Sequence, residues 1–364
     1  MPLKWTSSYL ILFLSALCLV AMALPLHASS GTEGAAFLDI PVGAGPATMG
    51  SAYSALATDA YAPIYNPAGL GFLQTPELSA QHLSYLESLN YEFGSFVFPL
   101  RTLNAALGAS VQYLGTGDIT ATNPDATSAG SYSAHYAAYS LAYGQHLTDR
   151  LSLGLTGKVV EAKIEAASAM AYAADLGALY KVSDKLNLAA TLTNVGNKLT
   201  FTSEGDSLPM AFHLGTAYRL EKHWKSTIEG VYSKTGLLSG RTGVEWSPLE
   251  AIALRAGYKT DTTKNLSALA GMTVGLGIHA FGQEFAYAWL PYGDLGDTQY
   301  FSLLLKFGAE QEQRKNLIQY QTIKQHRTAS GKPLSTDDVE YQQLMQLLKA
   351  SDDMQVADTK VGAQ

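Results

Sequence analysis

The sequence LNAALGASVQYL, residues 103–114, decides the class of fold. Apolar residues hold its odd positions, namely Leu103, Ala105, Leu107, Ala109, Val111 and Tyr113. The even positions between them are mainly small or polar. Successive side chains of a β-strand point to opposite faces, so this alternation predicts a strand with one apolar face and one small or polar face.

The same period of two recurs from about residue 77 to residue 307, in about fourteen segments. Clear examples are residues 151–156, 186–193 and 210–220. Segments of about ten residues suffice for tilted strands that cross an outer membrane. Aromatic residues near segment ends, such as Tyr91 and Trp224, fit the girdles of such proteins. The sequence therefore predicts an all-β fold, a transmembrane antiparallel β-barrel of about 14 strands.

The connections between these segments alternate in length, which is typical of outer-membrane barrels with tight periplasmic turns and longer outer loops. The alternative is a secreted β-sandwich or repeat protein, which has no reason to sort its loops in this way. The predicted short connections are residues 99–102, 147–150, 182–185, 220–223, 247–250 and 280–283. The predicted longer ones are residues 115–133, 161–168, 195–207, 233–240, 260–266 and 291–297.

The composition excludes several classes of protein. The chain has 364 residues, of which 15% are charged, against about 25% in typical soluble domains. The formal net charge is −7, from 24 Lys+Arg and 31 Asp+Glu. No basic stripe is present, so we expect no nucleic-acid partner.

The first 28 residues have the features of a secretory signal peptide. Lys4 precedes an apolar run from residue 10 to residue 26, and Ala28 is a small residue at the expected cleavage position. An uncleaved membrane anchor is the alternative. The single cysteine, Cys18, lies inside this run, so the predicted mature chain has no cysteine.

Between the signal and the first predicted strand, residues 29–76 are rich in small residues and turns. Residues 39–61 read DIPVGAGPATMGSAYSALATDAY, and residues 66–70 read NPAGL. Together with YGDLGD at residues 292–297, this pattern resembles the PorV/PorQ group of outer-membrane proteins, within the superfamily of long-chain fatty acid transporters of FadL type. The resemblance covers roughly residues 39–307, and it implies a barrel that acts in transport or secretion.

Residues 29–76 are predicted to form a plug inside the barrel, which occupies residues 77–308. Pro46 can open a helix, and residues 47–57 are small enough to pack closely against a wall. The plug or gate candidates are Asp59, Asn66, Pro67 and Gly69. They either form a constriction for a hydrophobic substrate or only anchor a static plug.

No enzyme site is apparent, and we expect neither a cofactor nor a bound metal. The histidines are dispersed, without the spacing of metal ligands. Arg241, Glu245 and Arg255 fall on faces assigned to the barrel lumen. Charges that face lipid would cost about 2–4 kcal/mol, so these three are predicted to pair across neighbouring strands or to orient a substrate.

Residues 309–364 lack the strand pattern. The sequence predicts two helices there, at residues 310–326 and 337–350. An even number of strands that begins in the periplasm also ends there, so this helical tail is expected in the periplasm. It either contacts a periplasmic partner or folds under the barrel, and for the final residues 351–364 a loosely ordered polar extension is the alternative.

We expect the protein in the outer membrane of a Gram-negative type of cell, with outer-membrane lipid around the barrel. Three functions compete for such a protein. The first is passage of hydrophobic small molecules through the plugged barrel. The second is a component of a type IX-like secretion system that binds exported proteins, as the PorV resemblance implies. The third is a purely structural barrel.

The tail yields a test that depends on topology alone. A tag at Gln364 should be protected from a membrane-impermeant probe in intact cells and should react once the outer membrane is permeabilised. Labelling in intact cells would contradict either the strand count or the assigned start of the barrel.

Overall fold

The computed structural model describes residues 33–85, 89–117, 119–125, 127–221, 223–260, 268–293 and 296–308. The predicted signal peptide, residues 1–28, and the predicted tail, residues 309–364, lie outside the described residues.

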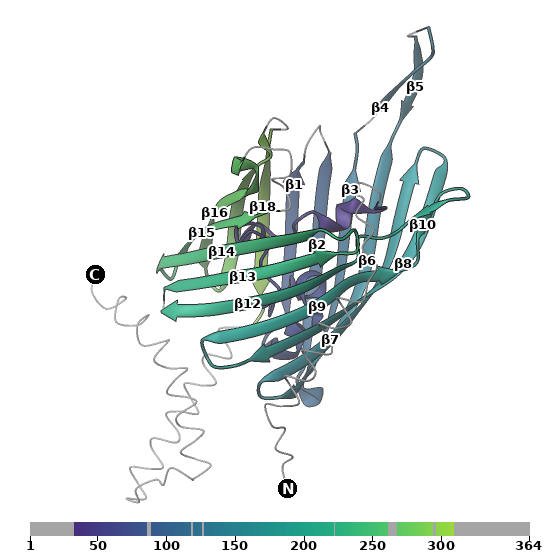
Figure 1. The fold of residues 1–364 in the computed structure, drawn as a ribbon. Helices are drawn as coiled ribbons and strands as arrows, with labels where there is room; N and C mark the ends of the chain where they lie inside the picture. Colours follow the sequence, from purple (N-terminus) through teal and green to yellow (C-terminus); the bar gives the residue numbers. More distant parts are fainter. Residues whose placement is uncertain are drawn as a thin grey trace, which may run out of the picture. The chain divides into compact units, whose positions relative to one another are not determined.

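Within the described residues the chain forms one closed barrel of fourteen strands (Figure 1). Each strand pairs antiparallel with its neighbours, and β1 lies beside β18 to close the ring. The predicted all-β barrel and its strand number are therefore confirmed. Its strands are β1 (Glu77–Ser84), β2 (Asn90–Leu100), β3 (Ala105–Gly115), β6 (Ala134–Thr148), β7 (Leu151–Ile164), β8 (Ala167–Lys181), β9 (Leu186–Gly196), β12 (Ala211–Glu221), β13 (Trp224–Ser233), β14 (Leu238–Leu249), β15 (Ile252–Lys259), β16 (Met272–Ala280), β17 (Gln283–Pro291) and β18 (Asp297–Lys306).

The two ends of the barrel differ in their connections. Tight turns join the strands at one end, with the 3-10 helix η4 (Arg101–Leu103) between β2 and β3. The other end carries two short hairpins, β4 (Ile119–Thr122) with β5 (Ser128–Tyr132), and β10 (Leu199–Thr200) with β11 (Gly205–Asp206). The β4–β5 hairpin extends beyond the rim of the wall (Figure 1).

Two predicted long connections are wrong. In place of the predicted residues 233–240, only residues 234–237 separate β13 from β14. Residues 161–168 were expected to be a loop, but β7 and β8 continue to a two-residue turn at Glu165 and Ala166. Glu165 has a φ of 54°, the left-handed conformation that a tight turn requires. Charged residues such as Glu161 and Lys163 are typical of a loop in sequence. In the structure they lie on β7, which stays paired with β8 up to the turn.

The burial pattern is inverted relative to a soluble protein. Large apolar residues face outward, as Leu141 and Ile228 do with exposed fractions of 73% and 65%. Polar side chains face inward, as Gln112 and Glu229 do with 1% and 2%. The wall thus has an apolar outer surface and a polar lining, the pattern of a barrel that spans a membrane.

Residues 33–76 lie inside the ring of strands (Figure 1). Their backbone and side chains hydrogen-bond to inward-facing residues around the wall, among them Ser302 of β18, Thr273 of β16 and Thr156 of β7. The segment contains the helices η1 (Ala36–Asp39), α2 (Ala44–Thr48), α3 (Ala62–Tyr65) and η2 (Pro67–Phe72). A further 3-10 helix, η5 (Ala268–Gly271), precedes β16.

The helix near Pro46 is shorter than the sequence suggests. Pro46 lies in the first turn of α2, where proline is tolerated, but the helix ends at Thr48 and does not continue through residues 47–57. Gly50 and Ser51 both have positive φ, at 61° and 59°. Two successive left-handed residues cannot continue an α-helix, so the chain turns there.

Glycines of the wall allow η2 to approach closely. A Cβ atom added at Gly144, Gly154 or Gly177 would lie 2.2–2.3 Å from atoms of Asn66 or Pro67. Only a residue without a side chain fits at this distance. These three positions, on β6, β7 and β8, therefore determine where η2 sits.

Among the described residues, no helix is long and apolar enough to cross a membrane.

Strand β7 provides a matched pair of substitutions. Gly154→Ala should lower the free energy of unfolding by about 1–3 kcal/mol, because the new methyl group clashes with η2. Gly157→Ala, where a Cβ meets nothing within 4 Å, should be nearly neutral. Denaturant unfolding in detergent micelles measures both, and equal effects would show that η2 does not press against this wall.

Candidate functional site

The N-terminal segment is held together by its own polar contacts, and Asp59 is central to them. Its Oδ2 accepts a hydrogen bond from the Tyr53 hydroxyl at 2.5 Å, and its Oδ1 accepts one from the Tyr61 backbone amide at 3.0 Å. Burial, together with the charge of Asp59, raises the pKa of Tyr53 well above its usual value. Asp59 thus ties two tyrosines within the segment.

Asn66, in contrast, connects the segment to the wall. Its Nδ2 donates to the carbonyl oxygens of Ser54, at 2.9 Å, and of Ala178 on β8, at 3.2 Å. Its Oδ1 accepts from the Ala68 amide at 3.1 Å and so begins η2. The side chain is completely buried and joins two parts of the segment to one strand.

The structure brings Asn66, Pro67 and Gly69 together, whereas Asp59 belongs to a separate cluster. Gly69 packs so closely on residue 57 that an added Cβ would lie 1.5 Å from the Ala57 carbonyl oxygen. Pro67 faces Gly144 and Gly154 of the wall. This geometry suits an anchor, and a gating role of the four residues remains a prediction.

A second attachment involves residues that sequence reasoning did not select. Glu229 on β13 accepts hydrogen bonds from the backbone amide and the hydroxyl of Ser54. Its other oxygen lies 2.9 Å from Nδ1 of His213 on β12. Lys225, Thr227 and Glu229 alternate along β13, so a search for inward-facing charges in register could have found Glu229.

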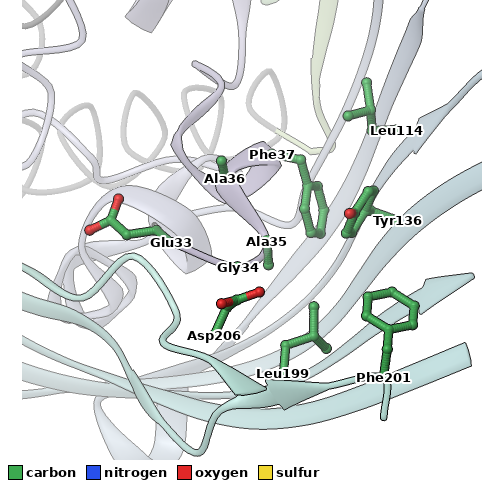
Figure 2. A pocket seen from close by; sticks show the side chains of 10 residues that line it. All are labelled: Glu33, Gly34, Ala35, Ala36, Phe37, Leu114, Tyr136, Leu199, Phe201 and Asp206. Atoms are coloured by element: carbon green, nitrogen blue, oxygen red, sulfur yellow. The ribbon is translucent and has the colours of Figure 1, made fainter. Parts of the chain in front are cut away.

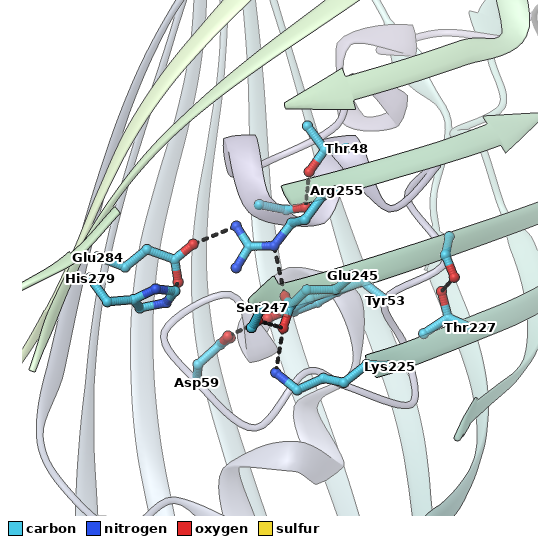
Figure 3. A network of polar contacts seen from close by, with 12 residues as sticks. Thr48, Tyr53, Asp59, Lys225, Thr227, Glu245, Ser247, Arg255, His279 and Glu284 are labelled. Carbon is cyan, nitrogen blue, oxygen red and sulfur yellow. Dashed lines mark hydrogen bonds and ion pairs between the residues drawn. The ribbon is translucent and has the colours of Figure 1, made fainter. Parts of the chain in front are cut away.

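Five charged or titratable side chains form a network on β13 to β17, which we name the Arg255 network (Figure 3). Arg255 Nε lies 2.7 Å from Oε2 of Glu245, and its Nη1 lies 2.5 Å from Oε1 of Glu284. Lys225 Nζ contacts Oε1 of Glu245 at 2.7 Å, and His279 Nε2 lies 3.2 Å from Oε2 of Glu284.

The Arg255 network supports α2 of the N-terminal segment. A Cβ added at Gly45 would lie 3.1 Å from Nη1 of Arg255 and 3.5 Å from Oε1 of Glu284. Two carboxylates balance the guanidinium and the ammonium, so the wall presents a paired surface to the helix. Buried charges are tolerated when they are paired in this way.

The sequence-selected trio of charges is only partly brought together. Glu245 and Arg255 are direct cross-strand partners on β14 and β15, as predicted for pairing. Arg241 lies four residues before Glu245 on β14, opposite Glu229 in the register of β13 and β14. Lys225, Glu284 and His279 complete the network and were missed, since their neighbours become visible only from the strand register.

A third polar cluster lies on β7, β8 and β9. Lys158 Nζ is 2.7 Å from Oδ2 of Asp175 and 2.8 Å from Oδ1 of Asn194. The backbone amide of Asn194 donates to Oδ1 of Asp175 at a bulge where the β8–β9 register shifts. The carboxylate therefore replaces a missing ladder acceptor and holds the wall closed at the bulge.

A half-open pocket of about 270 Å³, lined by polar and apolar groups in similar measure, lies at the barrel end that carries the hairpins. Figure 2 shows the rings of Phe37, Tyr136 and Phe201 around it. Phe37 and Tyr136 have ring centroids 5.5 Å apart. The ten lining residues are Glu33, Gly34, Ala35, Ala36, Phe37, Leu114, Tyr136, Leu199, Phe201 and Asp206.

The beginning of the N-terminal segment forms one side of this pocket. The Gly34 amide donates to the Ser207 carbonyl at 2.9 Å, and Glu33 bridges to Ser207 as a short parallel pair. Burial raises the pKa of Glu33, opposed by the Ser233 hydroxyl and the charge of Lys234. The pocket thus joins residues 33–37 to the β10–β11 hairpin and the wall.

Among the described residues, no group of three or more His, Cys, Asp or Glu side chains is arranged to hold a metal ion.

Comparison with known proteins identifies the fold and no family. No protein-family model matches the chain, and no curated protein is significantly similar in sequence. Among solved structures, the Ralstonia pickettii toluene transporter TbuX has 13% identity and a TM-score of 0.51, covering 73% of this chain and 98% of its own. The CymD monoaromatic hydrocarbon channel has 14% identity and a TM-score of 0.51, covering 74% and 98%.

A Pseudomonas aeruginosa FadL homologue is also similar, with 12% identity, a TM-score of 0.45 and coverage of 69% and 94%. At identities this low, the likeness to TbuX and CymD establishes a shared barrel fold. The more specific resemblance to the PorV/PorQ group, and the secretion role it implies, remain predictions.

The Arg255 network can be tested by removing one cation at a time. Arg255→Met should lower the free energy of unfolding by about 3–5 kcal/mol, because it removes the cation that two nearly buried carboxylates share and leaves Glu245 with Lys225 alone and Glu284 with His279 alone. Lys225→Met should cost less than about 1 kcal/mol, because the Lys225 side chain is 42% exposed. Denaturant unfolding in micelles measures both variants.

A rescue variant separates charge from packing in the same experiment. Adding Glu245→Gln and Glu284→Gln to Arg255→Met removes the two carboxylate charges that have lost the guanidinium, and it should recover part of the loss. Equal costs for the two single variants, or no recovery, would contradict a network held by charge.

Proposed function

We propose that this chain is an outer-membrane channel for hydrophobic small molecules, with residues 33–76 occupying its lumen. The observation that carries the proposal is the aromatic pocket at one end of a barrel whose other inward residues are mainly small or polar. Apolar pockets with a few polar groups are the usual binding sites for small molecules.

The proposed location rests on the predicted signal peptide and on the surface of the barrel. Exposed residues such as Leu141, Tyr172 and Ile228 lie on strands β6, β8 and β13. In water such a surface would drive association, whereas lipid tails satisfy it. The closed ladder leaves no strand edge in the membrane, as lipid requires.

The size of the pocket suggests the size of the ligand. An engineered apolar cavity of about 150 Å³ binds benzene, and sites for drug-sized ligands begin near 300 Å³. A pocket of about 270 Å³ therefore suits a single substituted ring or a short alkyl chain. The names of TbuX and CymD, a toluene transporter and a monoaromatic hydrocarbon channel, agree with this size class.

The N-terminal segment makes the proposed channel selective. Asn66, Ser54 and Gly45 contact three separate parts of the wall, so residues 33–76 obstruct free diffusion through the lumen. Molecules that bind the pocket beside residues 33–37 are then concentrated where the segment begins. Passage beyond this point requires local movement of the segment.

Filling the pocket tests the proposal directly. Ala36→Trp places a large ring where a ligand would bind and should weaken binding of a single-ring hydrocarbon at least tenfold, about 1.4 kcal/mol. Uptake of the labelled hydrocarbon by cells with an intact outer membrane should fall in parallel. Saturation-transfer NMR on the purified mature protein measures binding independently of uptake.

Ala167→Trp is the matched control, because Ala167 is exposed at the same end of the barrel and does not line the pocket. It should leave binding and uptake unchanged. Wild-type protein that neither binds the hydrocarbon nor raises its uptake would refute the proposed function.

A further inference from the structure

The charge of the pocket points to a narrower class of ligand than its apolar rings do. Of the ten lining residues, two are charged, and both are acidic: Glu33 and Asp206. This inference rests on the proposed function, because it assumes that the pocket binds a small molecule.

Asp206 is placed on the pocket side by the strand register. In the β10–β11 hairpin, Asp206 is the direct partner of Leu199, and directly opposite residues of an antiparallel pair share one face. Leu199 is a buried pocket residue, so the Asp206 side chain lies beside the apolar floor. Figure 2 shows Asp206 between Ala35 and Leu199.

The two acidic groups differ in how they are compensated. The Glu33 carboxylate accepts a hydrogen bond from the Ser233 hydroxyl at 3.2 Å and lies near Lys234. Lys234 itself donates to the Ser207 hydroxyl at 3.2 Å and does not line the pocket. Among the described residues, no side chain forms an ion pair or a hydrogen bond with the Asp206 carboxylate.

The neighbouring cation is directed elsewhere. A Cβ added at Gly205 would lie 3.0 Å from the Lys198 Cβ and 2.2 Å from the Thr200 Oγ1, so Lys198 shares the face of Thr200 and Gly205, opposite to that of Leu199 and Asp206. It is exposed and is not among the lining residues. The two charged side chains that line the pocket are therefore both acidic, with Lys234 as a cation outside the lining and aromatic rings on the opposite side.

We propose that the pocket prefers amphiphilic amines, molecules with one aromatic ring or a short alkyl chain and a protonated nitrogen. The apolar body fits among Phe37, Leu114 and Phe201, and the ammonium group lies toward Asp206. Ring faces attract cations, which adds to the attraction of the carboxylate. A carboxylate of the same shape is repelled by Asp206 and Glu33 and gains no such contact.

Three ligands of similar shape test this preference: 2-phenylethylamine, phenylacetate and neutral propylbenzene. At neutral pH and low salt, the purified mature protein should bind the amine about fivefold more tightly than propylbenzene and at least tenfold more tightly than phenylacetate. The first difference is the size expected for one exposed charge pair, and it should shrink in high salt.

Asp206→Asn should remove most of the preference for the amine while leaving propylbenzene binding unchanged, because the two side chains have the same size. Glu204→Gln is the matched control, since Glu204 is an exposed carboxylate of the same connection that does not line the pocket. It should leave the preference as in the wild type.

The outcomes separate this inference from the proposed function. Equal binding of all three ligands, or an amine preference that survives Asp206→Asn, overturns the charge preference and leaves a hydrophobic channel in place. Binding of none of the three ligands overturns the proposed function and the preference together.

Discussion

Closure of the hydrogen-bond ladder between β1 and β18 is the constraint on which the rest of the molecule depends. In lipid an unpaired backbone amide costs several kcal/mol, so a sheet that spans a membrane must have no edge. Once fourteen strands close, their alternating side chains divide into an apolar outer surface and a polar lining. That lining encloses a space too wide for side chains alone to fill, and residues 33–76 occupy it.

The polar lining determines how the N-terminal segment is held. Part of the contact is made through hydrogen bonds to inward hydroxyls, amides and charges, and part through a buried hydrophobic cluster that joins the segment to wall residues such as Tyr91 and Tyr300. Asn66 and Ser54 use backbone and side-chain groups together, while α2 rests on charges that already balance one another. Wall glycines complete the fit by allowing backbone to approach backbone. The aromatic pocket borders this hydrophobic cluster through Phe37 and Leu199, and it carries the functional proposal.

Local patterns predicted much of this architecture. Period-two alternation gave the strand count, because each strand must present opposite faces to lipid and lumen. It failed at residues 161–168, where charges lie on strands that extend to a two-residue turn. The helix expected at Pro46 is also short, because positive φ at Gly50 and Ser51 is not visible in a run of small residues. Glu245 and Arg255 were paired correctly, whereas Glu284 and Lys225 required the register across several strands.

The sequence by itself determined the fold class, the number of strands and the presence of an unusual segment before the first strand, since these follow from side-chain periodicity and turn residues along the chain. Only the tertiary structure decided which side chains meet inside the barrel. About 170 positions in sequence separate Phe37 from Asp206, and Tyr136 lies between them. The three form one pocket because the ring closes and residues 33–37 lie beside the β10–β11 hairpin. Proximity of this kind is set by strand register and closure, which are properties of the whole sheet and of no single segment.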